Sequence, residues 1–399
     1  MKLKGADIFR RDSGAGAFFL SILVWGVGTG CFAAALNNFL SEICFMDSVG
    51  RGWLELFREM PGLLLVVLFA ILHRVTDWRI LRIGTMLSMV GSAMLLCKGN
   101  QIYVTGAIMM WSLGEHLIMP VRQAIAMQVA KPEHAGQSLG LLTSTMNFGS
   151  VAGSLIVAVI FFAGSRFGDL SGRVLFNVVW GLVAVLMIVS AISTFTKNAP
   201  DVKAKRPKLY FNWKFRKFYA LELFYGARKQ FFMTFAPFVL IKVYGFSTAQ
   251  MALLLGICAA VNIFAAPVVG KITDKVGYRN VMIWDTVILF FVCLLYGFAD
   301  KLFSMKIALC VVCVNYLLDA IISTTSLATN IYLKTLADTQ DELTSSMSTG
   351  ISINHLISVI VGPLGGIVWA HYGVGTLFCF SAVMAVFNSI FAYTLPKNK

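Results

Sequence analysis

Residues 196–217 read TKNAPDVKAKRPKLYFNWKFRK and form the longest polar stretch of the chain. This stretch contains two prolines and eight lysines or arginines. The rest of the chain is strongly apolar: 58% of the 399 residues are apolar, 13% are charged, and the mean hydropathy is +0.78. Soluble domains hold about 25% charged residues. The composition therefore indicates that lipid surrounds most of this chain.

Apolar runs long enough to cross a bilayer recur on both sides of the polar stretch, since a spanning helix needs about 20 residues. Backbone groups in lipid must be satisfied within the segment, which favours helices, and the short-period alternation of a membrane barrel is absent from the sequence. The predicted spans are 17–40, 53–72, 80–97, 102–121, 139–163, 174–196, 215–241, 247–270, 281–299, 305–333, 346–370 and 374–395.

The polar stretch divides these twelve spans six and six. We predict an N-terminal six-helix bundle over 1–196, a cytoplasmic basic linker over 197–214 and a C-terminal six-helix bundle over 215–399. A weak internal repeat supports this division, because a shift of 200 pairs like residues, among them Gly26 with Gly226 and Arg79 with Arg279. The predicted fold class is an all-α membrane protein of two pseudo-symmetric bundles, an organisation typical of secondary transporters.

The distribution of lysine and arginine predicts the orientation. Segments on the side of both termini carry 23 of these cations, the opposite side carries seven, and Arg58, Arg228 and Lys229 fall inside spans. The positive-inside rule then places both termini in the cytoplasm and the chain in the cytoplasmic (inner) membrane. The net charge of +14 is explained by loops facing anionic lipid, so no nucleic-acid partner is expected.

The loop after the eighth span reads GKITDKVGYR, residues 270–279. It resembles the loop signature G-x-L-A-D-R-x-G-R-R/K of the major facilitator superfamily, with Gly270, Asp274, Gly277 and Arg279 in register, and Lys275 adds a further cation. The glycines are expected to allow a tight turn and close helix approach. The resemblance implies a loop that latches the cytoplasmic side in the outward-open state. The first-half copy, residues 70–79, departs from the signature, which leaves its role open.

A second resemblance to the same superfamily covers residues 114–154, through Pro120, Asn147, Gly149 and Gly153. Small residues at this spacing let membrane helices approach closely. The family resemblance implies alternating access around a cavity near the membrane midplane.

Ionisable residues within spans are costly and commonly functional. Glu55, Arg58 and Glu59 are spaced to share one helical face. They form either a self-neutralising salt-bridge group or a gate or proton site, because two acids share one base. Asp319 and the neighbours Glu115 and His116 are further candidates for proton coupling.

The sequence LFYGARKQFF, residues 223–232, places Arg228 and Lys229 at the middle of the seventh span. They either bind the anionic group of a substrate or are neutralised by acids such as Asp319, Glu115 or Glu222. Asp285 is expected to be structural. The uncharged candidates for the cavity wall, which alternatively hold helices together, are Asn37, Asn38, Asn262, Asn354 and His355.

These features predict a secondary active transporter of a small organic solute, with an organic anion as the first candidate, that is driven by protons and works as a monomer. The alternatives are proton-driven efflux of amphipathic drug-like compounds and a transporter-like sensor without transport. No enzyme, metal site or cofactor is expected, because the histidines and cysteines lack ligand spacing and no P-loop is present.

Overall fold

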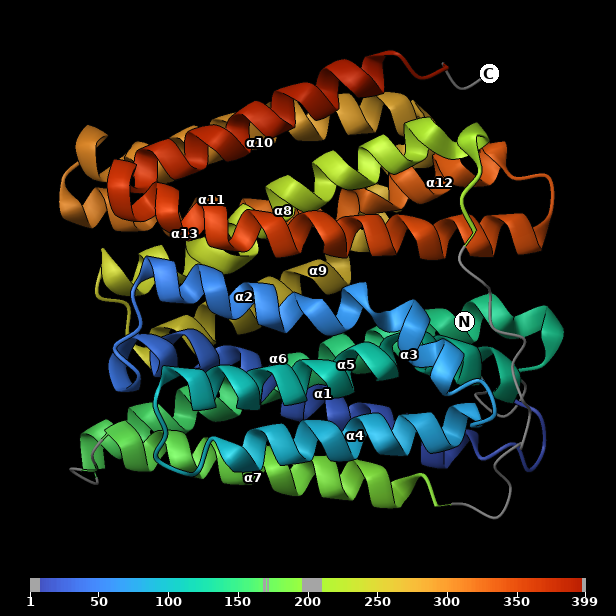
Figure 1. Ribbon diagram of the computed structural model, residues 1–399, viewed down its shortest axis with the longest axis horizontal. Helices are drawn as coiled ribbons and strands as arrows, with labels where there is room; N and C mark the ends of the chain where they lie inside the picture. The colour runs from blue at the N-terminus through green and yellow to red at the C-terminus, as the bar shows by residue number, and fades with distance from the viewer. Residues whose placement is uncertain (1–7, 168–169, 171, 196–209, 397–399) are drawn as a thin grey trace. The chain divides into compact units, whose positions relative to one another are not determined.

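The computed structural model describes residues 8–167, 170, 172–195 and 210–396, and these residues are mainly helical with no β-strand (Figure 1). Most of the predicted linker, residues 197–209, lies outside the described part. Contacts group the chain into two compact units. The first unit falls within Met1–Phe39, Val67–Arg206 and Thr248–Ala260, and the second within Leu40–Val66, Pro207–Ser247 and Val261–Lys399.

The helices of the first unit are α1 (Ala15–Asn38), α4 (Asp77–Met94), α5 (Gln101–Val129), η3 (Pro132–His134), α6 (Ala135–Phe167) and α7 (Gly172–Ser193). Those of the second unit are α2 (Ser48–Leu63), η4 (Trp213–Phe215), α8 (Arg216–Lys242), α10 (Tyr278–Leu302), α11 (Met305–Ile322), η5 (Ser323–Thr325), α12 (Ser326–Leu336) and α13 (Gln340–Tyr393). The unit boundaries fall inside η2 (Phe39–Ile43), α3 (Leu65–Ile71) and α9 (Thr248–Val276).

Each of the twelve predicted spans falls mainly on helical residues of the described part, although some spans are interrupted and the last residue of the sixth, 196, lies outside that part. The second span breaks at Leu64, between α2 and α3, and Pro61 lies inside α2 before this break. The last two spans form the single element α13, which Gly373 interrupts with a φ of 82°. The division of the chain into two six-helix halves remains a prediction.

Eight helical stretches of the described residues are long and apolar enough to cross a membrane. Helices α2, α4 and α8 are not among them. These three contain most of the charges that the sequence places inside spans, including Glu55 and Glu59 of α2 and Arg228 and Lys229 of α8. Charged side chains lower the hydropathy of α4 and α8, whereas α2, with 16 residues, is also shorter than a spanning helix.

Small residues bring α1 and α6 together in the first unit. A methyl group added at Gly153 of α6 would overlap the carbonyl oxygen of Val27, and one added at Gly30 of α1 would overlap that of Ser150. Backbones this close gain extensive van der Waals contact in a membrane, where little hydrophobic force acts between helices. The predicted close approach at Gly153 is therefore confirmed.

Replacing Gly153 by alanine should lower the free energy of unfolding by about 1–3 kcal/mol, because the added methyl group has to push two backbones apart. The matched control is Gly181→Ala, since no atom lies within 4 Å of a methyl group added there. Thermal unfolding of the purified protein in detergent measures both. Equal melting temperatures for the two variants would contradict this packing.

The second unit is built around α13, which packs along both α8 and α2 (Figure 1). The contact between α2 and α13 is again made by small residues: a methyl group at Gly52 would overlap the carbonyl oxygen of Gly362, and one at Gly366 would overlap that of Ser48. The hydroxyl of Ser48 also donates to the Gly366 carbonyl at 3.3 Å. This approach places the polar face of α2 directly against α13.

A polar cluster holds the described end of the predicted linker against the start of α13. The ammonium group of Lys214 lies 2.7 Å from a carboxylate oxygen of Asp338 and 3.1 Å from one of Glu342. The hydroxyl of Tyr210 donates to Glu342 at 3.3 Å. Donation from the Asp338 N–H lowers the pKa of Glu342, and hydrogen bonding to Asp338 raises the pKa of Lys214.

These pKa shifts predict how the cluster depends on pH. The contribution of Glu342 is present above its ordinary pKa and is lost as the pH falls through its lowered pKa, whereas that of Lys214 is lost only as the pH rises through its raised pKa. We expect Glu342→Gln at neutral pH to lower the protection of the backbone amides of residues 337–343 against hydrogen exchange. Their protection factors should fall to those that the wild type shows in acid. Exposed Lys271, replaced by alanine, is the control. Identical exchange in wild type and Glu342→Gln at neutral pH would refute the cluster's role.

Candidate functional site

Glu55 is the centre of a buried charge cluster on α2. Its carboxylate is fully buried and lies 2.6 Å from Nη1 of Arg51 and 2.5 Å from Nη2 of Arg58. It also accepts a hydrogen bond of 2.5 Å from the side-chain amide of Gln230 on α8. Gln230 donates further to the hydroxyl of Thr234, at 2.7 Å. Glu55 is thus saturated with donors, which is typical of a structural ion pair.

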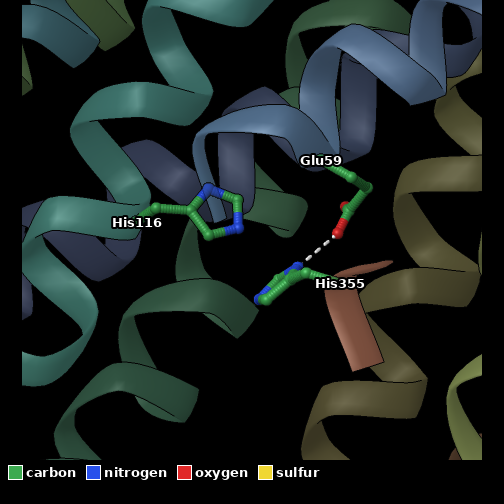
Figure 2. A group of neighbouring side chains, drawn as sticks. All are labelled: Glu59, His116 and His355. Carbon is green, nitrogen blue, oxygen red and sulfur yellow. Dashed lines mark hydrogen bonds and ion pairs between the residues drawn. The ribbon is translucent and has the colours of Figure 1, made fainter. Parts of the chain in front are cut away.

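Glu59 continues the cluster toward α13. One oxygen lies 2.6 Å from Nη2 of Arg58, and the other accepts from Nδ1 of His355 at 2.7 Å. Figure 2 shows the His355 ring facing the Glu59 carboxylate, with this bond dashed. The figure also labels His116, a residue of the first unit whose own hydrogen bonds are described below. The α2 charge cluster therefore connects three helices of the second unit: α2, α8 and α13.

The position of Arg51 corrects the sequence-based interpretation. The charge pattern predicts Arg51 in an outer loop and leaves two acids to share the single base Arg58. In the structure α2 begins at Ser48, capped by the Asp47 side chain, so Arg51 lies in its first turn and is 3% exposed. Two acids are therefore matched by two guanidinium groups, and the predicted surplus acid is absent from this cluster.

Arg228 and Lys229 have different surroundings on α8. The Arg228 side chain is 2% exposed, and its Nη1 lies 3.7 Å from a carboxylate oxygen of Asp319 on α11. Its guanidinium carbon is 4.9 Å from the centre of the Tyr225 ring. Its Nε is buried without a hydrogen-bond partner. One cation of the pair is therefore neutralised by an acid of the protein, as one of the two sequence-based interpretations expects.

Lys229 is half-exposed and forms no hydrogen bond or ion pair with the described residues of the second unit. Its charge acts at longer range on Asp319 and on Glu222, whose carboxylate accepts from the Asn354 amide at 3.4 Å. Adjacent helix positions diverge by about 100°, which explains why the two cations have different neighbours. Lys229 is the one of the two that retains capacity for another anion.

Asp285 of α10 lies in the same group of charges. It is 8% exposed, and one of its oxygens is hydrogen-bonded to the Thr325 hydroxyl of η5. The other oxygen is buried and has no hydrogen bond of good geometry with a described residue, although the Thr286 backbone N–H also acts on this carboxyl. The charge of Arg228 acts on Asp285 as well as on Asp319. Asp285 is therefore within electrostatic range of Arg228, and the expectation that it is structural stays a prediction.

The first unit contains Glu115 and His116, both on α5. His116 is buried, and its Nδ1 lies 2.8 Å from the Ser112 carbonyl and 3.0 Å from the Ser112 hydroxyl. Glu115 is half-buried, and its charge acts on Arg122, one side of whose guanidinium lies over the Trp25 ring. Arg122 was expected at the start of a loop, but α5 continues to Val129.

The remaining polar candidates are dispersed. Asn37 and Asn38 are buried on α1, Asn262 is half-buried on α9, and Asn354 and His355 lie on α13 with the contacts given above. Their assignment to a substrate cavity remains a prediction.

Most residues of the loop signature, 270–279, are helical, so they do not form a ten-residue loop. Helix α9 continues to Val276, and Gly277 alone makes the turn with a φ of 89° before α10 begins. Gly270 lies inside α9, and no atom lies within 4 Å of a methyl group added there, so its expected role in close helix approach is wrong. Asp274 and Lys275 are exposed, and the Arg279 guanidinium lies over the Tyr393 ring.

Comparison with known proteins decides the family. The family model of the Major Facilitator Superfamily matches residues 60–337. The chain belongs to the major facilitator superfamily. The resemblance that residues 270–279 carry in the sequence is thereby confirmed, and a member of this superfamily is a multi-pass membrane transporter rather than an enzyme. No match to a curated protein was found.

Solved structures of the superfamily share this fold. A variant of the nucleoside transporter NupG aligns with a TM-score of 0.74 and 13% identity, over 95% of this chain and 99% of its own. A variant of the peptide transporter POT aligns with a TM-score of 0.73 and 15% identity, over 95% and 94%. A D-xylose-proton symporter aligns with a TM-score of 0.71 and 15% identity, over 96% and 98%. At these identities the likeness establishes the fold alone.

Proposed function

We propose that this major facilitator is a secondary active transporter that moves a small organic anion across the cytoplasmic membrane by alternating access and is driven by protons. It acts as a monomer with both termini in the cytoplasm, an orientation that the lysine and arginine distribution favours. Its partners are the solute, protons and the lipid bilayer, and no cofactor takes part.

The proposal rests on one observation: the two adjacent cations on α8 differ in burial and in ion pairing. Arg228 is buried beside Asp319, whereas Lys229 is half-exposed and makes no ion pair with the described residues of its unit. An ammonium group at mid-helix is costly in a membrane unless it meets an anion or water. A carboxylate or phosphate of the solute would supply that anion. The ion pair between Arg228 and Asp319 would hold α8 against α11 next to Lys229.

Proton coupling is supported by the number of carboxyl groups within the spans. The charges of Arg228 and Lys229 act on Glu222, Asp285 and Asp319, and carboxyl groups inside a protein beside such charges are candidates for proton exchange. Among structural relatives, a D-xylose-proton symporter is described as moving its sugar together with protons. The fully paired Glu55 is a weaker candidate, because its charge is already satisfied by Arg51, Arg58 and Gln230.

Counterflow in proteoliposomes tests the substrate class. Vesicles loaded with a panel of unlabelled carboxylates, phosphate esters, nucleosides, sugars and amphipathic cations are diluted into traces of each labelled compound. We expect exchange of a small anion and none of the amphipathic cations. Exchange confined to amphipathic compounds would replace the proposal by the efflux function, and the absence of exchange with every class would favour a sensor.

A further inference from the structure

The charged groups around Arg228 do not balance when all are ionised. Arg228 and Lys229 supply two positive charges, and Glu222, Asp285 and Asp319 supply three negative ones. Arg228 acts on Asp285 and Asp319, while Lys229 acts on Asp319 and Glu222. Asp319, Arg228 and Cys379 of α13 also interact electrostatically with Cys293 of α10. Cys293 is a thiol and adds no charge. An uncompensated charge is expensive in this setting, so one carboxyl group is expected to carry a proton.

Asp285 is the one of these three carboxyl groups on which Lys229 does not act. Asp319 has the Arg228 guanidinium at 3.7 Å, and Lys229 acts on it too. Glu222 has the Asn354 amide and the influence of Lys229. Asp285 forms no ion pair with a described residue. Its negative charge has the Thr325 hydroxyl, the Thr286 backbone N–H and the longer-range charge of Arg228, and its Oδ1 has no hydrogen bond of good geometry with a described residue.

The hydrogen bonds of Thr325 indicate the same carboxyl group. The Thr325 hydroxyl has one hydrogen, but two acceptors lie within bonding distance: Oδ2 of Asp285 and, at 2.6 Å, the carbonyl of Ile322. A single hydrogen cannot serve both acceptors in good geometry. If Asp285 carries a proton on Oδ2, it donates to the Thr325 oxygen, and the Thr325 hydrogen then serves Ile322. This arrangement gives each of the two contacts its own hydrogen.

Arg228 is placed so that it can move between the two acids. Its pair with Asp319 is long for an ion pair, and its Nε has no acceptor. Tyr225, one turn earlier on α8, donates to the Ser323 carbonyl of η5 at 3.2 Å. The same short element carries Thr325, the partner of Asp285. The guanidinium group therefore lies beside the element that holds Asp285.

We propose that Asp285 is the proton-binding carboxyl of the transport cycle, protonated while Arg228 pairs with Asp319 and ionised when Arg228 turns to Asp285. The proton leaves Oδ2 as a hydrated proton on one side of the membrane and is replaced from the other side. This assignment rests on the proton coupling proposed above. It places the titrating group on α10, and not on Glu115 or in the α2 charge cluster.

Infrared difference spectroscopy of the purified protein, recorded between acid and alkaline pH, tests the assignment without a substrate. A protonated carboxyl has a carbonyl stretch that its ionised form lacks. We expect such a band in the wild type, shifted when aspartate carboxyls are labelled with carbon-13. The band should be lost at every pH in Asp285→Asn. Asp319→Asn and Glu222→Gln each remove one negative charge, so both should retain the band in acid and lose it at a lower pH than the wild type does.

A band that persists in Asp285→Asn, or that is lost at every pH only in Asp319→Asn or Glu222→Gln, would overturn the proposal. If Asp285→Asn does not fold, Thr325→Val provides the second test, because removing the hydroxyl should shift the frequency of the Asp285 band. An unshifted band there would also overturn it. Failure of the transport function is a separate result, seen as the absence of solute exchange in proteoliposomes.

Discussion

Replacing Lys229 by alanine should weaken binding of the transported anion by about 10- to 100-fold, the equivalent of about 1.5–3 kcal/mol for a hydrogen bond to a charged group. The reason is that Lys229 keeps its ammonium group available, whereas Arg228 already faces Asp319. The measurement is the concentration dependence of counterflow in proteoliposomes, for the anion that the panel identifies.

Two further variants make this result specific. Lys229→Arg keeps the charge and should retain most of the affinity, while Lys242→Ala removes an exposed lysine from the end of the same helix and should change nothing. Equal affinity in wild type and Lys229→Ala would show that this ammonium group does not bind the solute. Loss of affinity in Lys242→Ala as well would indicate a general effect of charge.

Glu55→Ala should cause the largest loss of stability, about 3–5 kcal/mol, because it leaves Arg51 and Arg58 without their buried counter-ion. Gln230 would lose its acceptor on α2 as well. Thermal unfolding in detergent measures the loss, and Asp300→Ala, which removes an exposed carboxylate of the same unit, is the control.

A double variant separates charge from packing. Removing Arg58 together with Glu55 should be less harmful than the sum of the two single changes, since each partner alone leaves an uncompensated charge. Strict additivity, or a Glu55→Ala protein as stable as Asp300→Ala, would contradict the view that the α2 charge cluster stabilises the second unit.

Much of the fold follows from the sequence because membrane helices have a strong and local signal. Apolar length predicts where the helices lie, and the loop signature over residues 270–279 predicts the superfamily that the family model confirms. The positions of breaks are harder to predict. Gly373 interrupts α13 with a positive φ, whereas Pro61 lies within α2, and Gly270 remains helical although its signature suggests a turn.

The candidate site is predictable where its contacts stay within one helix. The spacing of Glu55, Arg58 and Glu59 predicts their shared face because neighbours three and four residues apart always meet on a helix. Contacts between helices have no such rule. Gln230 directly follows the cationic pair in the sequence, yet nothing in its position indicates that it donates to Glu55.

Arg51 and Arg122 show a second reason why the sequence misplaces residues of the candidate site. Both lie near the ends of predicted spans, where hydropathy places a helix end only to within several residues. Asp47 caps α2 and draws Arg51 into its first turn, and α5 continues past Arg122 to Val129. The Asp47 cap was the available signal, because aspartate before a helix is a preferred N-cap residue.

Proton movement that accompanies solute movement is the most direct test of proton-driven anion transport by this major facilitator. Proteoliposomes with a pH-sensitive dye inside are given the anion identified by counterflow, with and without an imposed pH gradient. We expect the anion to accumulate only with the gradient, to carry protons as it moves, and to lose its accumulation when a protonophore is added. Anion flux that neither moves protons nor responds to the protonophore would contradict proton coupling.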